Sequence, residues 1–239
     1  MHVELFEISE RFRGPPKSGN GGYVCGRIAK NLQGTVSVRL KAPPPLNAPL
    51  RLESSEEEAR LFQDATLVGE AKRSELELQL PPSPSFEQAE ESAHSYLGFK
   101  KHAFPGCFVC GPDRKSADGL RIFPGSLGGT ATLAAPWTPD ASLGDECGNV
   151  RSEFVWSALD CTGGFAVLPL PVGVAIVLGE LCTSIVGTVG CGERCVVMGW
   201  PLGVQGRKRL AGSAVCTASG RLVAKARATW IEVPLSTWN

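Results

Sequence analysis

The chain has 239 residues, 24 of them Lys or Arg and 24 of them Asp or Glu, so its formal charge is zero. No block of like charge stands out, which argues against nucleic acid as a partner. Hydrophobic residues make up 43% of the chain, a share typical of a folded protein rather than a disordered one. The length suffices for one large domain or two small ones.

The N-terminal stretch MHVELFEISERF carries acids where a secretory signal needs basic residues and an apolar run. The longest apolar run, at about 165–178, is interrupted by prolines and a glycine and is too short to span a bilayer. We therefore expect a cytoplasmic protein with no membrane as a partner. The nine cysteines are then expected to be free thiols.

In the first half, one strand precedes a helix and several strands follow it. Asn20 is a suitable N-cap for a helix that runs to Leu32, and Gln33-Gly34 ends it. Gly21 and Gly22 would leave backbone N–H groups uncovered at the helix start. Strand patterns are found at 3–13, 36–40, 50–52, 59–62 and 67–72.

Residues 81–105 change character and are interpreted as a linker between two domains, 1–80 and 106–239. Within this linker, a Pro-rich breaker at 81–84 precedes an acidic surface helix over 86–96. The second half again has one main helix, 151–166, preceded by a loop at 137–149. Its strands are expected at 120–123, 129–135, 172–182, 194–202, 208–218 and 222–232. In the last of these, alternate residues from Ala224 to Trp230 form one face.

The two halves share this order of elements, which predicts a duplicated α+β unit. The segments Leu67–Arg73 and Leu222–Ala228 also share a short pattern. The second helix carries one acid, Asp160, on the side opposite its apolar arc. Trp156 lies one turn before Asp160 and Gly164 one turn after it. A second helix or a ligand on that side would explain why Trp156 and Gly164 flank Asp160. The alternative is that Asp160 is a solvated residue on an ordinary surface helix.

Several segments resemble hotdog-fold thioesterases in the tandem or "double hotdog" form, with a PaaI-like second half. Proteins of this kind have a Cys-rich and Gly-rich lead-in, a His-Gly-Gly helix start and an acid nine residues after that His. Three segments of this chain resemble that lead-in: Cys107-Phe-Val-Cys-Gly111, Asp118-Gly-Leu120 and the loop that begins at Ala135-Pro-Trp137. Arg151-Ser-Glu153 replaces His-Gly-Gly, and Asp160 stands at the acid position. In the first half, Asn20-Gly-Gly22 resembles the helix start, and Ala29 stands at the acid position.

The resemblance implies an α+β fold with two antiparallel sheets, each wrapped around a central helix and joined edge to edge. It also implies an acyl-CoA thioesterase whose acid comes from one helix while the glycine-rich start of the other binds the thioester carbonyl. Because one half keeps the glycines and the other keeps the acid, one complete site is expected per chain. Its partner would be an acyl-CoA or a related thioester, and the protein would be a homodimer of double hotdogs.

Asp160 would act as general base or nucleophile, and the helix start at Asn20, Gly22 and Tyr23 would polarise the carbonyl. Glu153, beside the site, is a second carboxylate that could raise the pKa of Asp160 or replace it. The remaining candidates would bind substrate. Trp156 or Tyr23 would line an acyl tunnel, Ser157 and Thr162 would orient water, and Lys208 and Arg209 would meet the phosphates of coenzyme A, unless they are simply solvated. The Asn20-Gly-Gly segment could also be only a tight turn.

Two cysteine pairs, Cys107/Cys110 and Cys191/Cys195, could together bind zinc, but buried free thiols are the favoured interpretation, so we expect no metal and no cofactor. No nucleotide-binding or α/β-hydrolase motif occurs, and only His2, His94 and His102 are present, which weakens a Ser-His-Asp mechanism. A non-catalytic acyl-CoA or acyl-carrier binding protein on the same fold is the alternative. A hotdog hydratase ranks below both, because it needs a His near the acid and none follows Asp160.

Overall fold

The computed structural model describes residues 1–238, which form one 11-stranded antiparallel sheet flanked by three α-helices. The strand order is β1-β3-β4-β5-β2-β8-β11-β10-β9-β7-β6. The first five strands are β1 (His2–Phe6), β2 (Val36–Leu40), β3 (Leu50–Ser54), β4 (Glu58–Gln63) and β5 (Thr66–Arg73). The other six are β6 (Gly125–Ser126), β7 (Leu133–Trp137), β8 (Val174–Ile185), β9 (Cys195–Gln205), β10 (Lys208–Thr217) and β11 (Leu222–Pro234).

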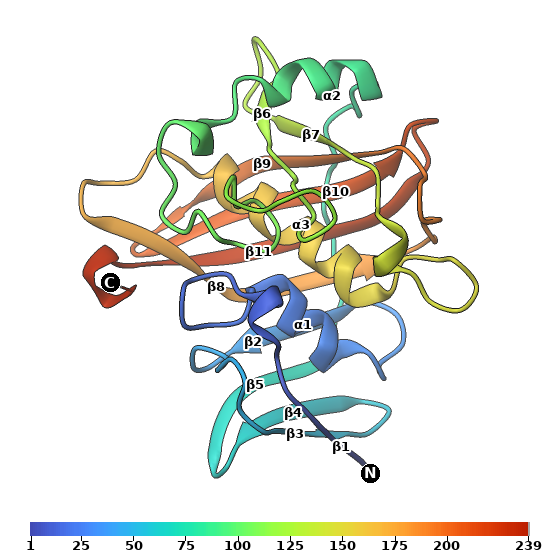
Figure 1. Cartoon of the computed structure of the whole chain (residues 1–239), viewed down its shortest axis with the longest axis vertical. Coiled ribbons are helices and arrows are strands. Elements are labelled where there is room, and N and C mark those ends of the chain that lie inside the picture. The colour runs from blue at the N-terminus through green and yellow to red at the C-terminus, as the bar shows by residue number, and fades with distance from the viewer. Residues whose placement is uncertain (239) are drawn as a thin grey trace.

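The two halves of the chain occupy the two halves of this sheet and meet where β2 pairs with β8 (Figure 1). The register at this junction sets Val36 opposite Thr183 and Arg39 opposite Glu180. The fold is therefore α+β with a large antiparallel sheet and few helices, as the sequence predicts. The halves join strand to strand, so the backbone hydrogen bonds continue across the boundary.

The helices α1 (Gly21–Ala29) and α3 (Ser152–Ala166) lie side by side on one face of the sheet (Figure 1). α1 packs against β2, β5 and β8, whereas α3 packs against β9, β10 and β11. α2 (Phe86–Ala93) packs on the other face of the sheet. Phe86 forms an apolar cluster with Met198 of β9, whereas the neighbouring Val197 belongs to the core beneath α3. Adjacent residues of a strand point to opposite faces, so α2 and α3 lie on opposite sides.

Most predicted elements are found close to their predicted bounds, and two strand predictions are wrong. The strand expected over 3–13 ends at Phe6, since Ser9 caps a short 3-10 turn at Glu10–Phe12. The strand expected over 120–123 is a loop in which Arg121 has a φ of 53°, a left-handed conformation that breaks a strand. The helix expected over 86–96 is present over Phe86–Ala93 and begins with a capping box between Ser85 and Gln88. The division into 1–80, 81–105 and 106–239 stays a prediction.

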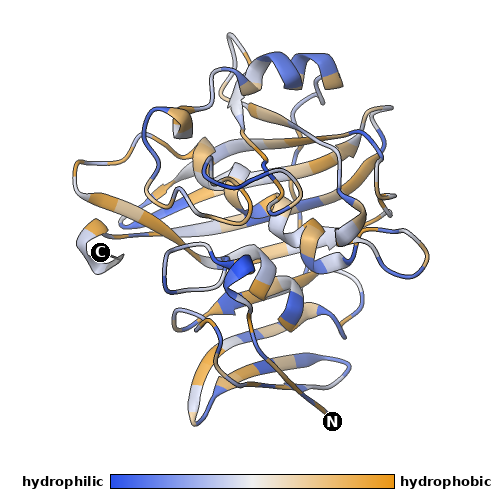
Figure 2. Ribbon diagram, in the orientation of Figure 1, coloured by the Kyte–Doolittle hydropathy of each residue, from blue (hydrophilic) through white to orange (hydrophobic). Residues whose placement is uncertain are grey.

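Hydrophobic residues gather on the loop that leads into β8 and along the first part of that strand (Figure 2). Val172, in this loop, is fully exposed. Among the described residues, none of the helices combines the length and the apolar character that crossing a bilayer requires. The apolar loop before β8 borders the cavity described below.

Candidate active site

The two central helices touch at glycines of α1. A Cβ atom built on Gly22 would lie 2.5 Å from Asp160 Cβ and 2.7 Å from the Trp156 carbonyl oxygen. One built on Gly26 would lie 2.5 Å from Glu153 Cα. Only residues without side chains let the backbones approach this closely. The start of α1 is therefore held directly against the middle of α3.

Asp160 lies in this contact and is 2% exposed. Its Oδ2 accepts hydrogen bonds of 2.9 Å from Asn20 Nδ2 and 2.9 Å from the Gly22 N–H. Asn20 also caps α1, because its Oδ1 accepts the Tyr23 N–H at 2.9 Å. The Asp160 carboxyl and the glycine-rich helix start, 138 residues apart in the chain, thus form one hydrogen-bonded unit.

The other carboxyl oxygen of Asp160, Oδ1, is buried and has no hydrogen-bond partner among the described residues. Burial raises the pKa of Asp160 to about 7, and the nearby Cys107 also raises it, although the hydrogen bonds from Gly22 and Asn20 oppose the increase. At neutral pH the group is therefore divided between its neutral and charged forms, which suits proton transfer.

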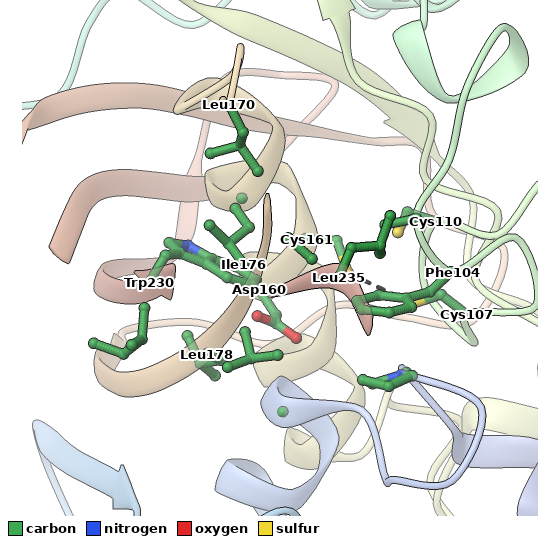
Figure 3. Close-up of a pocket in the computed structure, with 18 of the residues that line it drawn as sticks. Phe104, Cys107, Cys110, Asp160, Cys161, Leu170, Ile176, Leu178, Trp230 and Leu235 are labelled. Atoms are coloured by element: carbon green, nitrogen blue, oxygen red, sulfur yellow. Dashed lines mark hydrogen bonds between the residues drawn. The ribbon is translucent and has the colours of Figure 1, made fainter. Parts of the chain in front are cut away.

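Asp160 borders a cavity of about 740 Å³. Much of its wall is apolar and comes from the end of α3, the loop before β8, β8 itself and the C-terminal end of β11: Leu168, Leu170, Val172, Val174, Ile176, Leu178 and Trp230, with Leu235. Figure 3 shows the Asp160 carboxyl between such side chains on one side and a group of cysteines on the other. Lys100 and Lys101 also border the cavity and are exposed to solvent.

Three buried cysteines form that group: Cys107, Cys110 and Cys161, whose sulfur atoms all lie within 4.8 Å of one another. Cys107 Sγ and Cys161 Sγ are 3.7 Å apart. Hydrogen bonds from the Cys110 and Cys161 side chains, and from the backbone of Cys110 and Val109, hold the pKa of Cys107 well below its ordinary value. The spacing of Cys107 and Cys110 is visible in the sequence, but nothing there links them to Cys161.

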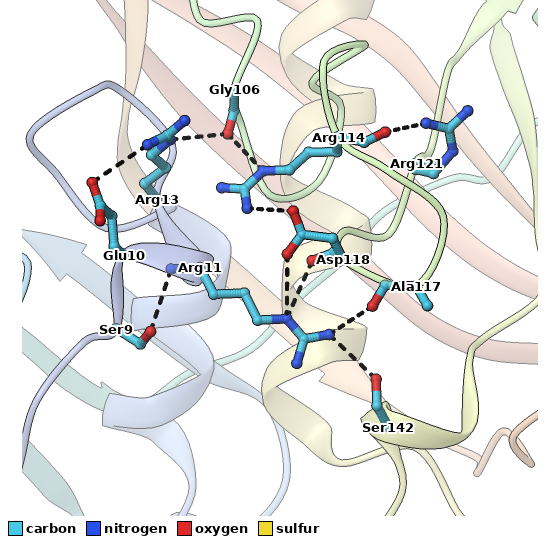
Figure 4. A network of polar contacts seen from close by, with 10 residues as sticks. All are labelled: Ser9, Glu10, Arg11, Arg13, Gly106, Arg114, Ala117, Asp118, Arg121 and Ser142. Carbon is cyan, nitrogen blue, oxygen red and sulfur yellow. Dashed lines mark hydrogen bonds and ion pairs between the residues drawn. The ribbon is translucent and has the colours of Figure 1, made fainter.

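A polar network fastens the loop that carries Cys107 and Cys110 to the N-terminal half (Figure 4). Arg11 donates to the carbonyl oxygen of Asp118 at 3.2 Å, and Arg114 donates to Asp118 Oδ2 at 3.0 Å. Arg13 and Arg114 both donate to the Gly106 carbonyl oxygen, at 3.3 and 2.8 Å. This network explains why the cysteine loop is held next to Asn20.

Comparison with known proteins decides the fold. No protein-family model and no curated protein sequence matches the chain. Among solved structures, it is similar to a tesB protein from Mycobacterium avium subsp. paratuberculosis, with a TM-score of 0.61, 15% identity and coverage of 97% of this chain and 93% of that one. An acyl-CoA thioesterase II, TesB2, from Mycobacterium marinum matches with a TM-score of 0.62, 9% identity and coverage of 97% and 93%. A conserved protein from Alicyclobacillus acidocaldarius described as having a hot dog fold matches with a TM-score of 0.60, 11% identity and coverage of 97% and 93%.

The chain therefore has a double hotdog fold. At these identities the similarity establishes the fold alone, so the chemistry of this double hotdog has to be argued from its own residues. The coverage of more than nine-tenths of each chain means that both halves belong to the shared architecture.

In this double hotdog, the predicted donors Gly22 and Tyr23 already have acceptors inside the protein, Asp160 and Asn20. The backbone N–H of Gly21 comes first in the helix, and Gly21 borders the cavity. Among the described residues the Gly21 N–H has no acceptor. The helix start lies where the sequence predicts it, but the free donor is Gly21, one or two residues before the predicted Gly22 and Tyr23.

Four predicted substrate-binding residues are buried elsewhere and do not border the described part of the cavity. Trp156 packs against Gly26, and Tyr23 stacks on Phe12 with ring centroids 4.2 Å apart. The Ser157 hydroxyl donates to the Glu153 carbonyl oxygen at 2.6 Å. Thr162 packs against Gly199 of β9. The positions of these side chains therefore give no support to the predicted roles in lining an acyl tunnel and orienting water.

The predicted charged residues also lie away from Asp160. Glu153 is about two turns before Asp160 on α3, close to Gly26, and it pairs with Arg151 at 3.7 Å. Arg209 pairs with Glu232 at 2.6 Å and donates to the Val167 carbonyl oxygen at 3.0 Å. Lys208 is exposed at the start of β10 and, like Arg209, is not part of the cavity wall described here. Lys100 and Lys101, which fall in the predicted linker, are exposed and border the cavity, as does Lys41.

Proposed function

We propose that this double hotdog protein hydrolyses acyl thioesters, with Asp160 as the catalytic carboxylate. The observation that carries this proposal is the position of Asp160. Its carboxyl borders a cavity of about 740 Å³ and is fixed through one oxygen by Asn20 and Gly22, while the other oxygen has no hydrogen-bond partner among the described residues. A carboxylate held in this way is prepared to take a proton without first breaking an internal hydrogen bond.

In the reaction, Asp160 Oδ1 accepts a proton from water as that water attacks the thioester carbonyl carbon. The tetrahedral intermediate then collapses, the carbon–sulfur bond breaks and the departing thiolate takes the proton back from Asp160. Direct attack by Oδ1 on the carbonyl, followed by hydrolysis of the resulting anhydride, uses the same geometry. In both routes Asn20 and Gly22 keep the carboxyl oriented.

The negative charge on the carbonyl oxygen needs a donor, and Gly21 is the candidate. Its N–H is at the first turn of α1, where backbone dipoles favour negative charge. Because a Cβ on Gly21 would lie 2.8 Å from Leu178 Cβ, the glycine also brings the helix start close to the cavity wall. This arrangement would put the carbonyl between Gly21 and Asp160.

The cavity wall suits the two ends of an acyl-CoA. The apolar side chains from Leu168 to Leu178 and the Trp230 ring offer a surface for an acyl group. Lys100 and Lys101 are exposed cations that would meet the phosphates of coenzyme A at the mouth. Among the described residues neither lysine forms an ion pair, whereas Lys41 pairs with Glu70 at 2.8 Å.

The experiment that tests this proposal measures release of free thiol from a panel of acyl-CoAs by the wild-type protein and Asp160→Asn. We expect turnover to fall by about 10²- to 10⁴-fold, the usual contribution of a general base. Glu153→Gln is the matched control, since it changes the other carboxyl of α3, away from the cavity, and we expect it to retain turnover. Unchanged turnover in Asp160→Asn would remove Asp160 from the mechanism.

A second candidate function is binding of acyl thioesters without hydrolysis. It is favoured by one observation: the N–H of Gly22 and the amide of Asn20 are hydrogen-bonded to Asp160 and not available to a carbonyl. Tight binding of acyl-CoA with no thiol release at any chain length would support this alternative. Thiol release that depends on Asp160 would exclude it.

A further inference from the structure

We propose that Cys107, Cys110 and Cys161 form a binding site for a divalent zinc ion, with three thiolates as protein ligands. The site joins the loop at 104–123 to α3, one residue after Asp160. It replaces the pairing considered from the sequence, because Cys191 lies against Gly144 and Cys195 starts β9. The proposal does not depend on thioester hydrolysis.

The sulfur positions fit a tetrahedral metal. Two sulfurs bound to zinc at about 2.3 Å in a tetrahedral arrangement are about 3.8 Å apart. Cys107 Sγ and Cys161 Sγ are 3.7 Å apart, and all three sulfurs lie within 4.8 Å of one another. A disulfide would require sulfurs at about 2.05 Å, so the three thiols are separate and each is available as a ligand.

The loop geometry directs two of these sulfurs to one point. The Gly111 N–H donates to the Cys107 carbonyl oxygen at 2.9 Å, which closes a turn around Phe108, Val109 and Cys110. A Cβ on Gly111 would lie 2.5 Å from that oxygen, so only glycine fits there. Backbone groups of Val109 and Cys110 donate to the Cys107 sulfur, as hydrogen bonds commonly do around metal-bound thiolates.

Side-chain donors surround the remaining sulfurs. His102 Nδ1 accepts the Phe104 N–H at 2.9 Å, so in the neutral ring the proton is on Nε2, which lies 3.3 Å from Cys110 Sγ. His102 is therefore placed to donate to a thiolate rather than to bind the ion. Asn20 Nδ2 lies 3.9 Å from Cys107 Sγ and 3.8 Å from Cys161 Sγ.

A tetrahedral ion held by three thiolates needs a fourth ligand, which the cavity can supply. Cys107, Cys110 and Cys161 all border it, so water or a ligand that enters the cavity can complete the tetrahedron. Three thiolates from two separate segments would also cross-link the loop to α3. The ion would thereby fix the wall of the cavity next to Asp160.

The first experiment measures metal content in protein purified without chelators from zinc-supplemented cells. We expect one zinc per chain in the wild type and background zinc in Cys107→Ser, Cys110→Ser and Cys161→Ser. Cys216→Ser is the matched control, because Cys216 is equally buried but lies on the opposite face of the sheet with α2, and it should keep its zinc. Zinc retained by all three variants would overturn the assignment.

A second measurement needs only the wild-type chain and covers the case in which the serine variants fail to fold. Cobalt(II) added to the metal-free protein should produce the intense visible absorption of a tetrahedral ion and a near-ultraviolet sulfur-to-metal charge-transfer band. Alkylation of the folded protein should spare these three cysteines with zinc bound and modify them after chelation. A wild-type protein with no zinc and no such cobalt spectrum, or with Cys107 in a disulfide, would overturn the proposal.

Discussion

The two central helices contribute different chemistry to one contact. α1 has nine residues, begins at glycines and has a side-chain cap from Asn20. α3 has 15 residues, begins after Arg151 without a side-chain cap, and carries Asp160. At the acid position of the resemblance, α1 has the buried Ala29 instead. Each helix therefore holds what the other lacks, and the proposed site needs both.

Asp160 is therefore oriented by residues from outside its own half of the chain. Its two hydrogen-bond donors, Asn20 and Gly22, come from α1. Glu153, the other acid of α3, contacts the same helix at Gly26 yet pairs with Arg151 and lies away from the cavity. An acid on α3 becomes a candidate catalyst only where it meets the start of α1. Four variants test this comparison.

The largest effect on folding is expected from Gly22→Ala. The added methyl group would lie 2.5 Å from Asp160 Cβ and 2.7 Å from the Trp156 carbonyl oxygen, and the second of these is backbone that cannot turn aside. We expect the free energy of unfolding to fall by about 3 kcal/mol, as measured in urea, with loss of turnover. Gly163→Ala is the control, because its methyl group would lie 3.3 Å from the nearest atom, Ala211 Cβ. Equal stability of the two variants would contradict the close helix contact.

Asn20→Ala removes the cap of α1 and one donor to the buried Asp160 carboxyl. We expect a loss of about 2 kcal/mol in the free energy of unfolding, since capping contributes about 1 kcal/mol and the lost donor adds to it. Ser85→Ala is the matched control, because it removes a cap from α2 without touching the site, and it should cost about 1 kcal/mol. If the two variants lose the same stability, the Asn20 bond to Asp160 contributes nothing to folding.

The sequence allowed the fold and the two helix starts to be predicted, whereas the hydrogen bond from Asn20 to Asp160 was not foreseen. The helix starts have local signals, namely the cap at Asn20 and the glycines that follow it. The periodicity of apolar residues predicted most strands correctly. It also predicted a strand over 120–123, which is a loop, because no pattern of apolar residues reveals the left-handed conformation of Arg121. That the two central helices meet was implied by the resemblance to double hotdog proteins.

The rest of the site depends on long-range packing that the sequence does not encode locally. Cys161 joins Cys107 across 54 residues, and no spacing rule connects them. Arg209 looks available in the sequence, but Glu232 on the neighbouring strand neutralises it at 2.6 Å. Lys100 and Lys101 were assigned to a linker, because nothing in their neighbourhood indicates that the cavity opens there.

Lys100→Glu combined with Lys101→Glu tests where coenzyme A would bind. We expect the KM for an acyl-CoA to rise about tenfold, which corresponds to about 1.4 kcal/mol, with a smaller change at high salt. The KM for the same acyl group on pantetheine, which lacks the nucleotide phosphates, should not change. Lys208→Glu is the control, since Lys208 lies away from the cavity wall. An equal effect of the Lys208 variant would show that only general charge matters.

The smallest effect is expected at the junction of the two halves, where Glu180 of β8 meets β2. Arg39 donates to Glu180 Oε2 from Nη2 at 2.8 Å, and Ser37 donates to Oε1 at 2.8 Å. Partial burial raises the pKa of Glu180, but these hydrogen bonds and the Arg39 charge outweigh it and leave the pKa below its ordinary value. A lowered folded-state pKa stabilises the protein above the unfolded-state pKa of about 4.3, and this contribution is lost as the pH falls through the folded-state value.

Glu180→Gln should therefore lower the free energy of unfolding by about 0.5–1 kcal/mol at neutral pH, a modest amount because Arg39 is largely exposed. The difference from the wild type should shrink as the pH falls below about 4.3 and then disappear, which urea unfolding across this range measures. Glu58→Gln is the control, since the Glu58–Arg60 pair is exposed and lies within β4, so its removal should change stability less at every pH. If the free energies of unfolding of Glu180→Gln and the wild type differ by the same amount at every pH, the ionised carboxylate of Glu180 does not stabilise the junction between the halves. The cohesion of the sheet at β2 and β8 would then come from backbone hydrogen bonds and the contact of α1 with α3 alone.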